Sequence, residues 1–163
     1  MRAALVTLVI TLMLDQASKF AVVEHMDLAL RGEIEVAPPW LNFRMAWNRG
    51  INFGLFAGEQ ETLRWLIIAV SLVIPVWVWL WLRRRAAGRF AWISAGLLAG
   101  GAFGNVIDRI RFGAVADFLN MTCCGIENPY AFNIADVAIF AGVAGLVLFT
   151  GEPPRRRRHR KTP

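Results

Sequence analysis

Ionisable side chains inside apolar segments are the first residues of this chain that could do chemistry. Asp15 and Lys19 interrupt the apolar run 3–23, and Asp136 is the single charged residue of the run 131–150. A charged group is costly in a membrane segment, so such residues usually face the interior of a helix bundle and serve a function. Asp15 and Lys19 stand four residues apart, acid before base, which is a favourable order for an ion pair. A purely structural pair is at least as consistent with this spacing as a catalytic one.

Asp136 has no basic residue within one turn of its own predicted helix, so its partners must come from elsewhere. We place it about 7 Å along that helix from the outer end, at about 1.5 Å per residue. The polar residues expected at the same depth surround the outer end of another apolar run, 90–107. They are Asn105, Asp108, Arg109 and Asp117, and Asn133 shares a helical face with Asp136.

Two carboxylates in a poorly hydrated site favour one chemistry. They cannot both ionise cheaply, so one keeps its proton while the other stays charged. Such a pair activates a water molecule and protonates a peptide leaving group in aspartic proteases. His25 and His159 lack metal-ligand spacing, and no Ser-His pair or glycine-rich phosphate loop can be assembled. The residues alone leave open a protease or a proton-coupled carrier, and their spacing does not select which acids form the pair.

The elements that must position these residues are membrane helices. The chain has 163 residues, of which 56% are apolar and 18% are charged, whereas a soluble domain has about 45–50% apolar residues. This composition excludes a disordered chain, a disulfide-stapled miniprotein and a multidomain enzyme. Crossing a hydrocarbon core of roughly 30 Å takes about 20 apolar helical residues. The segments that qualify predict helices at about 3–23, 65–82, 90–107 and 131–150.

The positions of the basic residues predict the orientation of these helices. Arg2, the turn 83–89 and the basic tail 153–163 belong together on the cytoplasmic side, which also places both termini there. The net charge of +6 then comes mostly from basic residues that mark the cytoplasmic side, where the lipid is anionic. We therefore expect no nucleic-acid partner. Arg2 and the apolar run after it also resemble a cleaved signal peptide, but the apolar pattern resumes at Phe20, so we expect a retained helix.

The segments 24–64 and 108–130 then face outward. Short apolar runs between glycines and prolines, such as 34–36 and 40–43, predict short strands in the first of them. About 40 residues are too few for an independent core, so this piece should rest on the membrane surface as a lid or cradle. The predicted fold is an all-α membrane protein with four transmembrane helices, a small extracytoplasmic β-rich cradle and a loop. Residues 1–152 would form one integral-membrane domain.

Small residues predict how two of the helices pack. Gly96, Gly100 and Gly104 recur every four residues in the third predicted helix. The fourth has two pairs at the same interval, Ala138 with Gly142 and Ala141 with Gly145. Small residues at that spacing let two helix backbones approach closely in lipid. We therefore predict that the third and fourth helices pack together.

Five short motifs, in order along the chain, carry a family resemblance. They are Asp15-Gln-Ala-Ser-Lys19, Asn48-Arg-Gly50, Gly104-Asn105-Val-Ile-Asp108-Arg109, Gly113-Ala-Val-Ala-Asp117-Phe118 and Phe132-Asn133-Ile-Ala135-Asp136. Together they resemble the signature blocks of bacterial lipoprotein signal peptidase, the type II signal peptidase. Each block alone is weak, but five in this order are specific, and they cover nearly the whole chain apart from the tail.

The resemblance implies an aspartic endopeptidase of the bacterial inner membrane, with its active site near the outer face. Such an enzyme removes the signal peptide from prolipoproteins before a diacylglyceryl-modified cysteine, works among membrane lipids without a metal or cofactor, and is blocked by the cyclic peptide globomycin. The implied catalytic pair is Asp117 and Asp136. The implied substrate-binding residues are Asn48, Gly50, Asn105, Arg109 and Asn133, and the implied structural polar residues are Asp15, Lys19 and Asp108.

Two departures from the family pattern lie in the outer segments. Ile51 and Asn52 stand where the family usually has small residues, and the stretch 122–125 contains the adjacent Cys123 and Cys124. Adjacent cysteines make a strained bridge, so we expect a free or loop-structural pair. Both departures leave the implied catalytic acids untouched.

The rival hypothesis is a small proton-coupled carrier or a lipopeptide-binding scaffold. It would use Asp15, Lys19 and Asp136 as a relay and would cut nothing.

Overall fold

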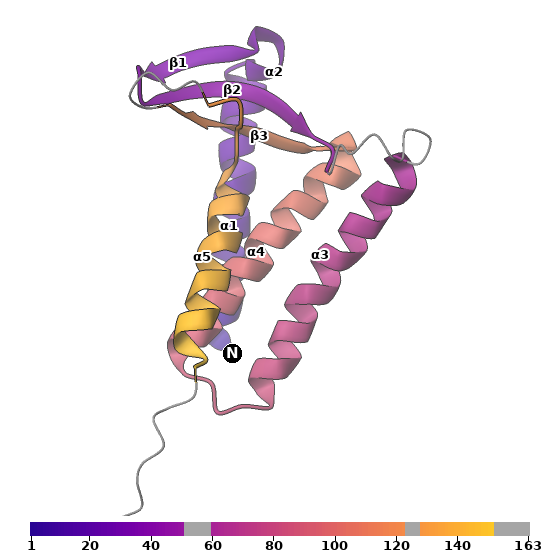
Figure 1. Cartoon of the computed structure of the whole chain (residues 1–163), viewed down its shortest axis with the longest axis vertical. Coiled ribbons are helices and arrows are strands. Elements are labelled where there is room, and N and C mark those ends of the chain that lie inside the picture. The colour runs from indigo at the N-terminus through magenta and orange to yellow at the C-terminus, as the bar shows by residue number, and fades with distance from the viewer. Residues whose placement is uncertain (51–59, 123–127, 152–163) are drawn as a thin grey trace, which may run out of the picture.

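The computed structural model describes residues 1–50, 60–122 and 128–151, whose long helices carry a small sheet at the end opposite the N-terminus (Figure 1). The helices are α1 (Arg2–Lys19), a π-helical continuation (Phe20–His25), α2 (Leu28–Arg31), α3 (Gln60–Arg83), α4 (Arg89–Phe112) and α5 (Ile134–Phe149). The strands are β1 (Glu33–Ala37), β2 (Leu41–Asn48) and β3 (Val115–Met121). Ile51, Asn52, Cys123, Cys124 and the basic tail from residue 153 lie outside the described residues.

Three of the described helical segments are long and apolar enough to cross a membrane. They are Arg2–His25, Glu61–Arg83 and Arg89–Phe112. The fourth predicted helix, 131–150, is shorter in the structure because α5 has 16 residues, which is about 24 Å of helix against a hydrocarbon core of roughly 30 Å. The structure confirms a mostly helical fold with a small sheet, and its described residues contain three helices of spanning length and a shorter apolar helix.

The helix ends near the sheet differ from the prediction. α4 continues past residue 107 to Phe112, so Asp108 and Arg109 lie in its last two turns rather than in an outer segment. α3 begins at Gln60 rather than at residue 65, and its polar first turns include the pair Arg64 Nη2 to Glu61 Oε1 at 3.2 Å. A prediction based on apolar length omits such polar turns because they do not have to lie in lipid.

Small residues set the helix packing, but their predicted pairing is partly wrong. α5 packs on α4 as expected, and a Cβ at Gly142 would lie 2.6 Å from the backbone nitrogen of Leu98. Gly96, Gly100 and Gly104, however, face α1 instead of α5, and a Cβ at Gly100 would lie 2.7 Å from the carbonyl oxygen of Leu8. α4 is therefore the central helix, in contact with α1, α5 and α3 (Figure 1).

The sheet is antiparallel in the order β1-β2-β3. The strands β1 and β2 lie where the sequence predicted short strands, but β3 was not predicted. One face of the sheet is apolar, because Ala116 and Phe118 pack against Val22 and Val23 of the π-helical segment and Leu28 of α2. The edge of β3 away from β2 pairs with Phe132, whose N–H donates to the carbonyl of Leu119 at 3.0 Å.

Candidate active site

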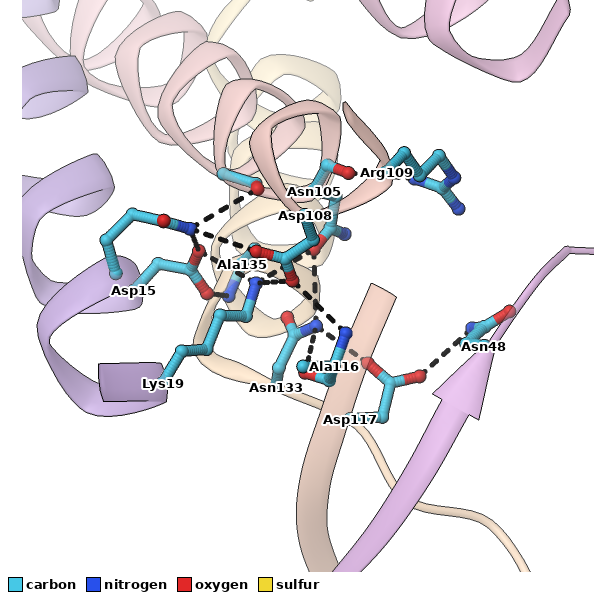
Figure 2. Close-up of polar contacts among 12 residues, drawn as sticks. Asp15, Lys19, Asn48, Asn105, Asp108, Arg109, Ala116, Asp117, Asn133 and Ala135 are labelled. Carbon is cyan, nitrogen blue, oxygen red and sulfur yellow. Dashed lines mark hydrogen bonds and ion pairs between the residues drawn. The ribbon is translucent and has the colours of Figure 1, made fainter. Parts of the chain in front are cut away.

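The polar residues singled out from the sequence gather where β2 and β3 meet the ends of α1, α4 and α5 (Figure 2). Asn48 is the last residue of β2, and Asp117 lies on β3. Asn105 and Arg109 project from α4, Asn133 is the N-cap of α5, and Asp136 lies in its first turn. Residues from five elements thus meet in one small volume.

Asp117 is buried, with 2% of its surface exposed. Its Oδ1 accepts from Asn133 Nδ2 at 2.7 Å, and its Oδ2 accepts from Asn48 Nδ2 at 3.0 Å. Burial, followed by the negative charge of Asp136, raises the pKa of Asp117 from 3.8 to about 6. Asp117 therefore holds a proton at pH values where an exposed aspartate has lost it.

Asp136 is half-buried and belongs to a capping box. Its N–H donates to Asn133 Oδ1 at 2.9 Å, and its Oδ2 accepts from the Asn133 N–H at 3.2 Å. Its Oδ1 accepts from Asn105 Nδ2 at 2.9 Å. The predicted depth of about 7 Å inside the helix is wrong, because residues 131–133 are extended to pair with β3 and the helix starts only at Ile134.

Asn133 connects the two acids. Its side chain donates to Asp117 and accepts from the backbone of Asp136, and it is fully buried. The charge of Asp136 acts on Asp117 strongly enough to be the second cause of its raised pKa. The structure therefore brings together two carboxyls that the sequence could place only at a similar depth.

Gly50 and Arg109 complete the rim of the site. The Gly50 N–H donates to Asn48 Oδ1 at 3.0 Å, which leaves the amide nitrogen of Asn48 for Asp117. Gly50 has a φ of +101°, a conformation that favours glycine. Arg109 is half-buried, and its Nη1 donates to the carbonyl of Asn105 at 3.4 Å. Within the described residues Arg109 forms no ion pair, although its charge interacts with those of Asp136 and Asp117.

Asp15, Lys19 and Asp108 form a buried cluster beside Asn105 (Figure 2). Lys19 Nζ lies 2.9 Å from Asp15 Oδ2 and 2.7 Å from Asp108 Oδ2. Asp15 Oδ1 accepts from the N–H of Ala135 at 3.0 Å, and Asp108 Oδ2 accepts from the N–H of Ala116 at 3.1 Å. The cluster thus ties the start of α5 and the edge of β3 to α1 and α4.

Sequence reasoning missed two residues of this region. Gln16 bridges Asp15 Oδ2 at 3.1 Å and Asp108 Oδ1 at 3.2 Å, and its polar side chain in an apolar run was a usable signal. Asn120 is buried on β3 and donates to the carbonyls of Asn128 and Tyr130, at 2.7 and 2.9 Å. No local pattern marks Asn120. Among the described residues, no three His, Cys, Asp or Glu side chains gather as metal ligands would.

Comparison with known proteins identifies the family. The model of "Signal peptidase (SPase) II" matches residues 7–150 of the chain. The chain belongs to the signal peptidase II family. It is 45% identical to the lipoprotein signal peptidase of Methylobacterium radiotolerans over 96% of this chain and 90% of that one. It is 43% identical to that of Methylorubrum extorquens, over 95% and 89%.

The fold comparison agrees with this membership. A solved bacterial membrane enzyme superposes on the chain with a TM-score of 0.76 at 25% identity, covering 93% of this chain and 94% of the other. The chain is therefore a multi-pass membrane peptidase of the aspartic type, as signal peptidase II enzymes are. The family resemblance drawn from the five motifs is confirmed.

Proposed function

We propose that this signal peptidase II cleaves prolipoproteins before their diacylglyceryl-modified cysteine and that Asp117 and Asp136 are its catalytic pair. One observation carries the assignment: two carboxyls from different elements share Asn133, and one of them holds its proton to about pH 6. A pair with one proton is what peptide hydrolysis by acids requires. The relatives named lipoprotein signal peptidase support the substrate class.

The proposed reaction uses a water molecule between the two carboxyls. The ionised carboxylate takes a proton from the water, whose oxygen attacks the scissile carbonyl carbon, while the protonated partner gives its proton to the carbonyl oxygen. The resulting diol then loses one hydroxyl proton back to that partner. The first carboxyl passes its new proton to the leaving nitrogen as the C–N bond breaks. The products are a signal peptide with a new carboxyl end and a lipoprotein with a free cysteine amine.

The residues at the rim would hold the substrate around this pair. The guanidinium of Arg109 has no ion-pair partner among the described residues, and it would bind carbonyl groups of the substrate backbone by charge-assisted hydrogen bonds. Asn48, Gly50, Asn105 and Asn133 would position both the carboxyls and the peptide. Globomycin would inhibit by occupying the same site.

The membrane arrangement follows from the same proposal. The sheet and the acid pair lie at the end of the bundle opposite the turn between α3 and α4, which is flanked by Arg83 and Arg89 (Figure 1). With that turn and both termini in the cytoplasm, the active site lies near the outer face. This topology needs α5 as a fourth crossing, and its exposed Phe140 and Val147 suit contact with lipid. The acyl chains of the substrate would then stay in lipid beside the helices.

The decisive experiment follows the mass of a synthetic diacylglyceryl-cysteine precursor. We expect the purified enzyme to shorten it at the residue before the cysteine, with inhibition by globomycin, and Asp117→Asn and Asp136→Asn to abolish cleavage. Glu24→Gln is the matched control, because Glu24 is an acid at the same end that pairs with Arg111 at 3.4 Å outside the site. A precursor of unchanged mass would favour a carrier or scaffold, and active asparagine variants would reject the acid pair.

A further inference from the structure

The orientation of one active-site amide is set by a charge that lies outside the acid pair. Lys19 Nζ, besides its two carboxylate contacts, donates to Asn105 Oδ1 at 3.3 Å. Its side chain is 7% exposed. Its three N–H bonds therefore have three acceptors, and all three residues are buried: Asp15, Asp108 and Asn105.

This contact decides whether the oxygen or the nitrogen of the Asn105 side-chain amide faces Asp136. An ammonium group only donates hydrogen bonds, so the atom of Asn105 beside it must be the oxygen. The second donor to the same oxygen is Asn133 Nδ2 at 3.2 Å. The nitrogen of Asn105 is left to point the other way, where it donates to Asp136 Oδ1 at 2.9 Å. A flipped amide would set its nitrogen against two donors on one side and its oxygen against a carboxylate oxygen on the other.

The surroundings of the two acids also favour a negative charge on Asp136 over one on Asp117. Asp136 lies in the first turn of α5, where the unpaired N–H groups and the helix dipole stabilise a negative charge. It is half-buried, whereas Asp117 on β3 has 2% of its surface exposed. A negative charge is more stable at the more solvent-exposed position and at the N-terminal end of a helix.

We infer that Lys19 is a positioning residue: it turns the amide nitrogen of Asn105 toward Asp136, which makes Asp136 the ionised base and leaves the proton on Asp117. This inference rests on the proposed acid pair and adds the role of each member. In the reaction, Asp136 would then take the proton of water and Asp117 would protonate the carbonyl oxygen. Lys19 itself does not touch the substrate in this scheme.

The charged groups around this amide come from each element packed against it. They are Asp15 and Lys19 on the first helix, Asp108 and Arg109 on α4, Asp117 on β3 and Asp136 on α5. In this scheme only the ionised form of Asp136 accepts the proton of water, and the hydrogen bond from Asn105 stabilises that form. Loss of this hydrogen bond should therefore move the acid limb of the pH profile of kcat/KM to higher pH.

The test compares kcat and KM across pH in the full-length enzyme. Lys19→Met removes the ammonium, and Asn105→Leu removes the donor while Lys19 keeps its charge. We expect each variant to lower kcat at least about tenfold and to raise the acid limb by about one pH unit. KM should change little in Lys19→Met, because Lys19 does not touch the substrate. Lys19→Arg, whose head group also only donates, should keep the wild-type limb.

Gln16→Met is the matched control for a merely structural role. It removes contacts to Asp15 and Asp108 but none to Asn105, so it should lower the melting temperature and leave the acid limb in place. An unmoved limb in Asn105→Leu, or in a folded Lys19→Met, overturns the inference. If Lys19→Met does not fold, Asn105→Leu and Lys19→Arg decide the question. Failure of the acid pair itself would look different, because Asp117→Asn and Asp136→Asn would then still cleave.

Discussion

The electrostatic coupling between the two acids predicts how Asp117 titrates when its partner loses its charge. The difference between a pKa of 3.8 and one of about 6 corresponds to about 3 kcal/mol in favour of the protonated carboxyl. Burial is the larger cause and the charge of Asp136 the second. Replacing Asp136 by Asn removes only the second cause. The pKa of Asp117 should therefore fall below about 6.

The assay is a carboxyl-carbon NMR titration of the enzyme labelled at aspartate, in detergent micelles. Asp117→Asn identifies the resonance, and Glu24→Gln is the control that should leave its titration unchanged, since Glu24 pairs with Arg111 away from the site. An unchanged pKa in Asp136→Asn would show that the two acids are not coupled.

The same pKa has consequences for activity and for stability. The protonated form of Asp117 is lost as pH rises through about 6, so kcat/KM should decline above that pH by about tenfold per unit. Because the folded pKa is raised, the folded state binds more protons than the unfolded state between 3.8 and about 6. The contribution of Asp117 to stability is therefore present below pH 3.8 and is lost as pH rises through about 6.

Two further predictions concern packing and substrate binding. A Cβ at Gly142 would lie 2.6 Å from the Leu98 nitrogen and 2.7 Å from the Ser94 carbonyl, so Gly142→Ala should cost about 1–3 kcal/mol of stability in thermal unfolding. Gly88→Ala, where a Cβ meets nothing within 4 Å, is its control, and equal melting temperatures would contradict the packing argument. Arg109→Ala should raise KM about tenfold through a lost charge-assisted contact, while an unchanged KM in a folded variant would reject that role.

Much of the helical framework could be predicted because its cause is local. Long apolar runs had to be membrane helices, and the hairpin β1–β2 followed from short apolar runs between turn residues. Asp136 stood out because an ionisable residue in an apolar run is costly unless it serves a purpose. Asp15 and Lys19 were recognised as an ion pair for the same reason, and the structure places them 2.9 Å apart.

The features that escaped prediction depend on contacts between distant segments. β3 is a strand because β2 pairs with one of its edges, while Phe132 and the Asp108 carboxylate satisfy the other. Because Phe132 pairs with β3, α5 begins at Ile134 rather than near residue 131, and Asp136 lies in its first turn. Gly96, Gly100 and Gly104 of α4 face α1, whereas Gly101 faces α5. Spacing alone does not say which neighbouring helix packs on which glycines.

The sequence by itself determined that this chain is a membrane protein with a costly set of acids, and its ordered motifs indicated the peptidase family. Both features follow from the lipid surroundings. A membrane span must be apolar, and an acid within it costs free energy, so it is retained where it serves a function. Only the tertiary structure decided which acids meet. Asp117 lies near Asp136 because β3 is held against the start of α5 by contacts of Asn133, Asp108 and Phe132. Those hydrogen bonds join residues far apart in the chain, so no local pattern encodes them.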